Sequence, residues 1–200
     1  MGYTKHLTLC LALLPFLTVS CKGTVDRRID PDEPDAVGGA VLDSQDIRAM
    51  ADKMSRDIIA SGILKSATPE RTSFYITGLR NDTSDTIDRE IVLTKIRTEL
   101  AKNLGRQVKI LDRSKEGMEE IQRERAAKRA GAVTSGELKG LAGSDYVLKG
   151  TIKERMKQAG KLKSVYYLVT FELTDLESGE LSWTNDYEVK FESEKSVITR

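Results

Sequence analysis

Histidine and cysteine are nearly absent from this sequence of 200 residues, which contains one histidine and two cysteines. His6 and Cys10 both fall within residues 1–20, a segment that we predict is removed from the mature protein. Cys21 then remains as a single cysteine, so no intramolecular disulfide can form. The same scarcity excludes Cys–His nucleophiles, histidine general bases, thiolate or imidazole zinc sites and haem ligation. We therefore expect no cofactor, no metal site and no catalytic residue in a protein that is not an enzyme.

The mature chain also lacks an excess of charge of either sign. The whole sequence has 32 Lys and Arg residues against 31 Asp and Glu residues, and loss of Lys5 with the N-terminal segment makes the two equal. Proteins that bind nucleic acids or anionic surfaces usually carry a basic excess. The balance therefore argues against a protein of either kind.

Residues 1–20 have the pattern of a secretory signal peptide. A short polar segment with Lys5 precedes an apolar run that ends at Val19. Such a run of roughly 7–15 apolar residues is shorter than the roughly 20 needed to span a bilayer. The segment Leu17-Thr-Val-Ser-Cys21 resembles a lipobox, in which the cysteine is diacylated and becomes the new N-terminus. The alternative is an ordinary signal peptide with a chance cysteine, but Cys21 directly follows the apolar run and a polar segment follows it.

We divide the chain into a signal peptide (1–20), a lipidated N-terminus with a flexible tether (21–42), and a single globular domain (43–200). The tether contains two prolines and is rich in Asp and Gly, as disordered segments are. Two or three acyl chains on Cys21 would anchor the protein stably to a membrane. By resemblance to bacterial sorting signals, Lys22 favours the outer membrane and its periplasmic face.

Hydrophobic patterns predict an α/β (α+β) domain. Apolar residues at helical spacing predict helices near 44–62, 87–105, 114–130 and 135–141, and runs of β-forming residues predict strands near 72–79, 108–111, 146–152, 165–173 and 181–191. The first two strands and the helix between them form a βαβ unit, so they should be parallel. The last three strands should form an antiparallel meander. The result is a mixed sheet with helices packed on it.

Several finer features follow from the same patterns. We expect Ser44 to cap the first helix and Gly62 to end it. The second helix should bury one face (Leu93, Ile96, Leu100 and Leu104), with Ile87 and Ile91 burying a second side of its first turns. Alternation should bury one face of each of the last two strands. Those faces are Val165, Tyr167, Val169, Phe171 and Leu173, then Leu181, Trp183, Tyr187, Val189 and Phe191.

Three groups of residues have both a functional and a structural interpretation. Asp82, Asp85 and Asp88 could bind a cation, but they lack the spacing of a calcium loop, and helix capping and first-turn charge explain them. The basic residues of 114–130 alternate with glutamates, which favours a solvated helix face over an interaction patch. The strand aromatics should mostly be core residues, although Tyr and Trp also anchor interfaces. These aromatics are Tyr166, Tyr167, Trp183 and Tyr187.

Five segments resemble those of a known family, in the same order along the chain. They are Ser44-Gln-Asp-Ile-Arg48, Leu79-Arg-Asn-Asp-Thr-Ser84, Ile96-Arg-Thr-Glu-Leu100, Gly143-Ser-Asp-Tyr-Val-Leu-Lys-Gly150 and Asp175-Leu-Glu-Ser-Gly-Glu-Leu-Ser-Trp183. Together they resemble the penicillin-binding protein activator LpoB family. The resemblance implies an outer-membrane lipoprotein that stimulates a bifunctional peptidoglycan synthase, and a fold similar to the N-terminal domain of TolB. The short tether differs from the long, proline-rich tethers of well-studied members.

The resemblance implies a bifunctional penicillin-binding protein as partner, docking on the globular domain near the Gly-x-Asp-Tyr strand. Tyr146 and Lys149 are the expected partner-binding residues, and we expect a monomer. The alternative is a subunit of an outer-membrane export system of the curli-secretion type. Such a subunit needs membrane-spanning hairpins with an apolar outward face, whereas here the second face of the last two strands carries acidic residues. These are Glu172, Asp186, Glu188 and Glu192.

The lipobox resemblance predicts that Cys21 carries the membrane anchor. Replacing Cys21→Ala should convert a membrane-bound protein into a soluble periplasmic one, because the acyl chains have no other attachment site. Cell fractionation measures this change. Mass spectrometry of the wild-type N-terminus is the direct check, and an unmodified Cys21 there would contradict the prediction.

Overall fold

The computed structural model describes residues 27–31, 33, 39–65, 70–105, 107–134 and 136–194. The predicted signal peptide and Cys21 lie outside these residues, as does part of the predicted tether. The chain divides into two units, Met1–Asp30 and Pro31–Arg200, and every helix and strand described below belongs to the second. Among the described helices, none has the length and apolar character to cross a membrane.

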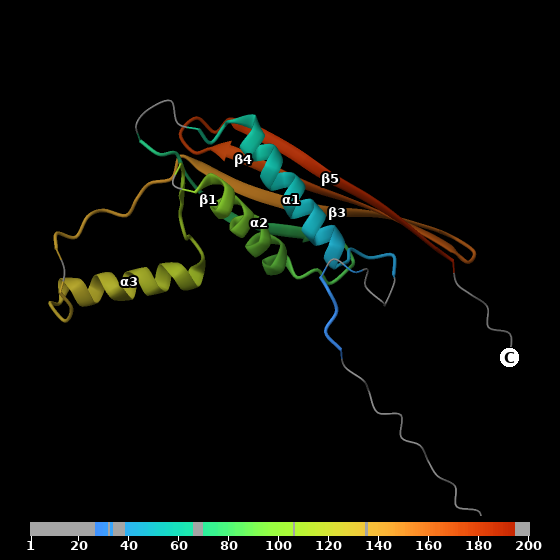
Figure 1. Cartoon of the computed structure of the whole chain (residues 1–200), viewed down its shortest axis with the longest axis horizontal. Coiled ribbons are helices and arrows are strands. Elements are labelled where there is room, and N and C mark those ends of the chain that lie inside the picture. The colour runs from blue at the N-terminus through green and yellow to red at the C-terminus, as the bar shows by residue number, and fades with distance from the viewer. Residues whose placement is uncertain are drawn as a thin grey trace, which may run out of the picture. The chain divides into compact units, whose positions relative to one another are not determined.

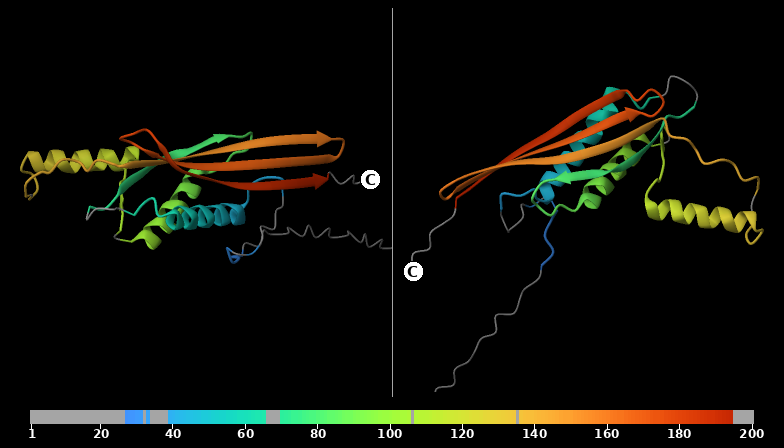
Figure 2. Two further views of the ribbon diagram at one scale, coloured as in Figure 1. Left: turned by 90° about the horizontal axis from the view of Figure 1, so that it is seen from above. Right: turned by 180° about the vertical axis from the view of Figure 1, so that it is seen from behind.

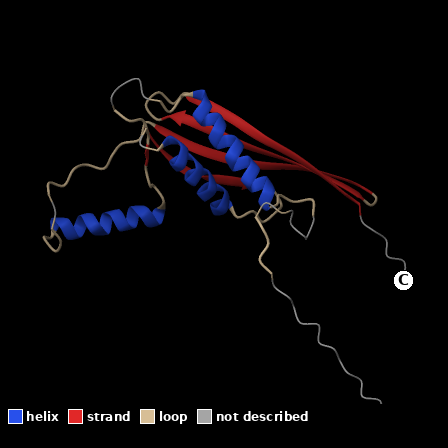
Figure 3. Ribbon diagram, in the orientation of Figure 1, coloured by secondary structure: helices blue, strands red, loops and turns tan. Residues whose placement is uncertain are grey.

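A five-stranded mixed sheet forms the frame of the domain, in the order β2-β1-β3-β4-β5 (Figures 1 and 3). The strands are β1 (Ser73–Asp82), β2 (Lys109–Ile110), β3 (Tyr146–Ala159), β4 (Leu162–Asp175) and β5 (Leu181–Glu194). β1 pairs in parallel with β2 and β3, whereas β3, β4 and β5 form an antiparallel meander. Helix α2 (Arg89–Leu104) connects β1 to β2. The predicted βαβ unit, meander and mixed α+β fold are confirmed.

Helix α1 (Ser44–Ser61) begins and ends through local hydrogen bonding. The N-cap is Asp43, one residue before the predicted cap Ser44, so that prediction is wrong by one position. Asp43 accepts hydrogen bonds from two backbone N–H groups of the first turn at 3.0 and 2.9 Å. Asp46 in turn accepts the backbone N–H of Asp43 at 3.2 Å, which completes a capping box. Gly62 ends the helix as predicted, with φ of 73° in the left-handed region.

Helix α2 begins later than the sequence suggests, at Arg89, because Asp88 caps it and β1 continues to Asp82. Its core face is buried as predicted, from Leu93 to Leu104. The predicted burial on two sides is wrong, because Ile91 in the first turn is 56% exposed. Ile87 does pack against the core, from the loop before the helix.

The hydrophobic core lies between helices α1 and α2 and one face of the sheet (Figure 2). Alternate residues of β4, from Val165 to Leu173, are all buried, as predicted. On β5, Trp183 is buried and the predicted residues after it pack against the core, but Leu181 is 50% exposed. The pairing of β4 with β5 shifts between Leu173 and Thr174, so Leu181 lies opposite Thr174 on the other face. A bulge of this kind explains why simple alternation is wrong for Leu181.

Helix α3 (Lys115–Arg129) has no buried residue. Glu124 and Lys128 form an ion pair, with 3.3 Å between Oε1 and Nζ, and the predicted solvated helix face is confirmed. The short helix predicted at 135–141 is wrong, since residues 136–141 are not helical. Gly136 and Gly140 disfavour a helix, and so short a segment cannot offset the cost of helix nucleation.

The packing of α2 predicts a large effect of Leu100→Ala. Leu100 is fully buried, so truncation removes apolar contacts and leaves a cavity, which should lower the free energy of unfolding by about 2–5 kcal/mol. Urea denaturation measures the change. Thr98→Ala on the exposed face of the same helix is the control and should change it by less than about 0.5 kcal/mol. Equal effects of the two substitutions would mean that α2 does not pack as described.

Candidate functional site

Tyr146 and Lys149, the expected partner-binding residues, lie near the start of the central strand β3. Tyr146 is half-buried and packs against the core, opposite Phe74 of β1. Side chains alternate along a strand, so Lys149 points to the opposite face, as expected. There Lys149 is exposed, with its Nζ 3.4 Å from Oε2 of Glu172 on β4. The structure brings the two residues onto one strand but not onto one surface.

Carboxylates surround the Tyr146 end of β3. Burial raises the pKa of the Tyr146 hydroxyl, and the negative charges of Asp175 and Asp145 raise it further. Asp145 accepts hydrogen bonds from the backbone N–H and the hydroxyl of Ser73 at 2.7 and 2.9 Å. Asp175 accepts two backbone N–H groups of the β4–β5 turn, both at 2.8 Å, which lowers the pKa of Asp175. The Tyr146 hydroxyl therefore stays protonated, and the carboxylates of Asp145 and Asp175 beside it are both held by hydrogen bonds.

Lys149 lies on the sheet face that α1 and α2 leave uncovered, which we call the open face. It borders a shallow hollow that is lined by β1, β3 and the first turn of α2. The hollow has a volume of about 470 Å³. It lies where β1 shifts register between Ile76 and Gly78, an irregularity typical of a β-bulge. Three cations line it, namely Arg80, Arg89 and Lys149, together with the single carboxylate of Glu90. Two of these cations already have carboxylate partners, since Arg80 pairs with Asp82 and Lys149 pairs with Glu172.

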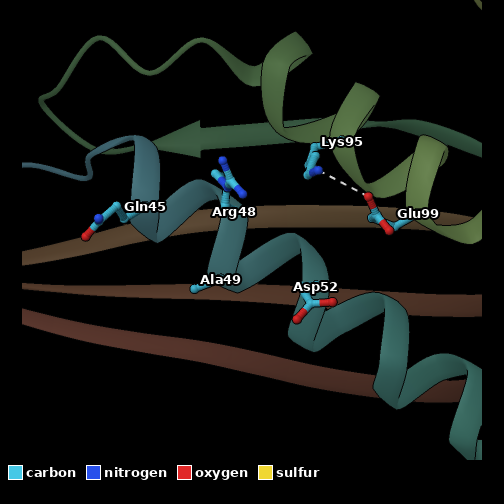
Figure 4. Close-up of a pocket in the computed structure, with 6 residues that line it drawn as sticks. All are labelled: Gln45, Arg48, Ala49, Asp52, Lys95 and Glu99. Atoms are coloured by element: carbon cyan, nitrogen blue, oxygen red, sulfur yellow. Dashed lines mark hydrogen bonds and ion pairs between the residues drawn. The ribbon is translucent and has the colours of Figure 1, made fainter. Parts of the chain in front are cut away.

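A second hollow lies between helices α1 and α2 (Figure 4). Glu99 of α2 accepts hydrogen bonds from Lys95 at 3.1 Å and from Lys102 at 3.3 Å. These two bonds lower the pKa of Glu99. On α1, Asp52 pairs with Arg56 at 2.8 Å. Lys95 and Asp52 of this groove are thus each matched by an opposite charge on their own helix.

The acidic residues between β1 and α2 have three separate roles. Asp88 caps α2, accepting backbone N–H groups at 3.0 and 3.2 Å, as predicted. The capping explanation is wrong for the other two. Asp82 ends β1 and pairs with Arg80 at 2.9 Å, and Asp85 accepts the hydroxyl of Tyr167 on β4. In the described part of the chain, no three His, Cys, Asp or Glu residues are placed to hold a metal ion.

Sequence reasoning missed the carboxylates of α1 that meet the aromatic residues of β5. Trp183 donates from Nε1 to Asp57 at 3.0 Å, and Tyr187 donates from its hydroxyl to Asp46 at 3.1 Å. Burial, together with the charge of Asp46, raises the pKa of Tyr187 to about 12. Tyr167, Trp183 and Tyr187 all face the core, which confirms the structural interpretation of these aromatics. Their partners lie far away in sequence, so no local pattern reveals them.

Comparison with known proteins decides the family. The family model described as peptidoglycan-synthase activator LpoB matches residues 46–189, which include nearly all of α1 to β5. The chain belongs to the LpoB family. The resemblance drawn from the five sequence segments is thereby confirmed. LpoB-family proteins are outer-membrane lipoproteins that regulate a peptidoglycan synthase, so family membership supports an activator rather than an enzyme.

Solved structures of LpoB-family proteins are similar to this chain. The C-terminal domain of LpoB from Salmonella enterica shares 13% identity with a TM-score of 0.42, and the alignment covers 72% of this chain and 98% of that one. The corresponding domain from Escherichia coli shares 14% identity with a TM-score of 0.41 and the same coverage. The NMR structure of E. coli LpoB shares 15% identity with a TM-score of 0.39, covering 93% of this chain and 88% of that one. A comparison with curated proteins gives no sequence match.

Gly150 of β3, the residue after Lys149, faces Leu79 and Phe171 in the core. We therefore expect this position to be sensitive to substitution. A Cβ atom at Gly150 would lie 2.7 Å from Cδ1 of Leu79 and 2.8 Å from the Phe171 ring, closer than packed atoms approach. Gly150→Ala should therefore lower the free energy of unfolding by about 1–3 kcal/mol through overpacking. Urea denaturation tests this, with Gly143→Ala as the control, because a Cβ there meets no atom within 4 Å. An unchanged free energy of unfolding in Gly150→Ala would show that Leu79 of β1 and Phe171 of β4 do not pack against this residue as described.

Proposed function

We propose that this chain is a lipid-anchored periplasmic protein that binds and activates a bifunctional peptidoglycan synthase of the penicillin-binding protein class. The match of the family model to residues 46–189 carries this proposal. That range covers the folded domain and begins after the predicted tether. Family-specific activity is therefore expected in the globular domain, while residues 21–42 serve as its connection to the outer membrane through Cys21.

The proposed docking surface is the end of the sheet where β3 begins. Its open face offers Lys149 beside the hollow that Arg80 and Arg89 also line, and its rim, where β3 begins, offers Tyr146 beside Asp145 and Asp175. A partner that contacts the open face would meet Lys149, whose side chain is 51% exposed. A partner that contacts the rim would meet the Tyr146 hydroxyl. Because the two side chains point to opposite faces, a flat contact would centre on one of them.

The open face supports this proposal over an export subunit of the curli-secretion type. Glu172 forms the ion pair with Lys149 there. Asp186, Glu188 and Glu192 of β5 pair with residues of β4 that share this face. A face with these charges is suited to water or to a charged partner, whereas lipid-facing strands need apolar side chains.

A purified-component assay tests the proposed function. The lipidated protein should co-purify with a bifunctional synthase from detergent-solubilised membranes and should increase its rate of peptidoglycan synthesis. A matched mock purification from cells that lack the protein is the control. Recovery of a ring of identical subunits without a synthase would contradict the proposal and favour the export alternative.

Substitutions at Tyr146 locate the contact. If Tyr146 anchors the partner, Tyr146→Ala should weaken synthase binding by about 2 kcal/mol, roughly thirtyfold. Tyr146→Phe keeps most of the packing volume and removes the hydroxyl, so it should weaken binding while the domain keeps its thermal stability. Binding affinity and melting temperature are measured together. If Tyr146→Ala unfolds the domain while Tyr146→Phe binds the synthase normally, Tyr146 is a core residue and not a contact residue.

Lys149 is tested in the same assay with a matched control. Lys149→Ala removes a cation from the hollow, whereas Lys190→Ala removes a cation from β5 whose Nζ is also paired, 3.1 Å from Glu192. If the hollow receives a carboxylate of the synthase, Lys149→Ala alone should weaken binding. Equal effects of the two substitutions would indicate only a general dependence on charge.

A further inference from the structure

The paired ends of β3 and β4 extend beyond the helices that cover the rest of the sheet (Figures 1 and 2). The last pair joins Ala159 to Leu162 through a tight turn, in which Gly160 has φ of 59°. On the helix side of β3, Ile152 is fully buried but Met156, four residues further on, is 49% exposed. The helical cover therefore ends between these two residues. We call residues 153–163 the hairpin tip.

The hairpin tip is strongly basic. It carries five cations and one carboxylate, Glu154. Within the described part of the chain, none of the five cations forms an ion pair. The cations are Lys153, Arg155, Lys157, Lys161 and Lys163. Helix α3 differs, because its cations alternate with glutamates. The overall balance of charge, which argued against a protein that binds anionic surfaces, hides this local excess.

Apolar side chains are exposed among these cations. Leu162 is 58% exposed and Met156 is 49% exposed. By strand alternation they lie on opposite faces of the hairpin. A hollow of about 530 Å³ lies at the tip, lined by Leu162 and Ala159 with Lys157, Ser164 and Glu192. From the neighbouring strand β5, Glu192 is paired with Lys190 and Glu194 lies opposite Leu162, so the five cations of the tip still outnumber the carboxylates beside them.

We propose that the hairpin tip docks end-on against an anionic phospholipid surface. Exposed apolar residues surrounded by Lys and Arg are the composition that binds the interface of acidic membranes. Cations and apolar side chains occur on both faces of the tip. A flat protein surface would contact one face and leave the other exposed, whereas a lipid headgroup layer can surround an end-on hairpin. The proposal is independent of synthase binding.

The lipid chains are omitted from the test so that binding reports on the hairpin alone. The chain from Lys22 retains every described helix and strand and every buried core residue. Its binding is measured by co-sedimentation with vesicles of equal parts phosphatidylcholine and phosphatidylglycerol, and with vesicles of phosphatidylcholine. We expect at least about tenfold tighter binding to the anionic vesicles, since each cation near such a surface contributes roughly fivefold.

Two triple variants of equal charge distinguish the tip from a general effect of net charge. Lys157→Gln/Lys161→Gln/Lys163→Gln should reduce binding to anionic vesicles by about tenfold or more, and Leu162→Ser should reduce it severalfold. Arg123→Gln/Arg125→Gln/Arg129→Gln on α3 should leave it within about twofold. A thermal melt by circular dichroism confirms that each variant is folded.

Four results would overturn the proposal. The wild-type chain could bind both vesicle types equally, or bind neither. The two triple variants could lose binding to the same extent, which would assign the effect to net charge. With polyglutamate as a second probe, the chain could bind polyglutamate but not anionic vesicles, which would make the tip a docking site for an acidic polypeptide.

Discussion

Two helices on one side of a five-stranded sheet impose the main constraint on this domain. Helices α1 and α2 must cover all the apolar side chains of that face, and they cover it only as far along β3 as Ile152. Among the described residues no helix covers the other face, and it carries charged side chains, including Lys149, Glu172 and the acidic residues of β5. The exposed tip and the charged open face both follow from this single-sided cover.

Aromatic donors connect the layers of this structure. Tyr167, Trp183 and Tyr187 fill the core with their rings, and each carries a polar atom that cannot be left buried without a partner. Carboxylates supply the partners: Asp85 before α2, and Asp57 and Asp46 on α1. These bonds join residues 82, 126 and 141 positions apart in sequence. They therefore tie α1 and the segment before α2 to β4 and β5 at defined points.

The sequence predicted features that depend on local periodicity, such as the alternation of β4, the end of α1 at Gly62 and the opposite faces of Tyr146 and Lys149. It failed where a neighbouring strand decides the outcome. Leu181 was misplaced because its face depends on a bulge in the β4–β5 pairing, and the hollow beside Lys149 depends on a bulge in β1. Asp85 was misassigned because its partner is Tyr167, far along the chain. The site residues came from the family resemblance, since nothing local distinguishes Tyr146 from other strand tyrosines.

The segment between β2 and β3 has a consequence for how the sequence can change. Arg113 donates a hydrogen bond to the carbonyl of Ala142, which closes the base of this segment, and α3 within it buries no residue. The core therefore does not depend on α3, whereas Ser144 and Asp145 at the end of the segment hydrogen-bond to Ser73 of β1. Helix α3 is accordingly the natural place in this segment for inserting an affinity tag or a fluorescent reporter.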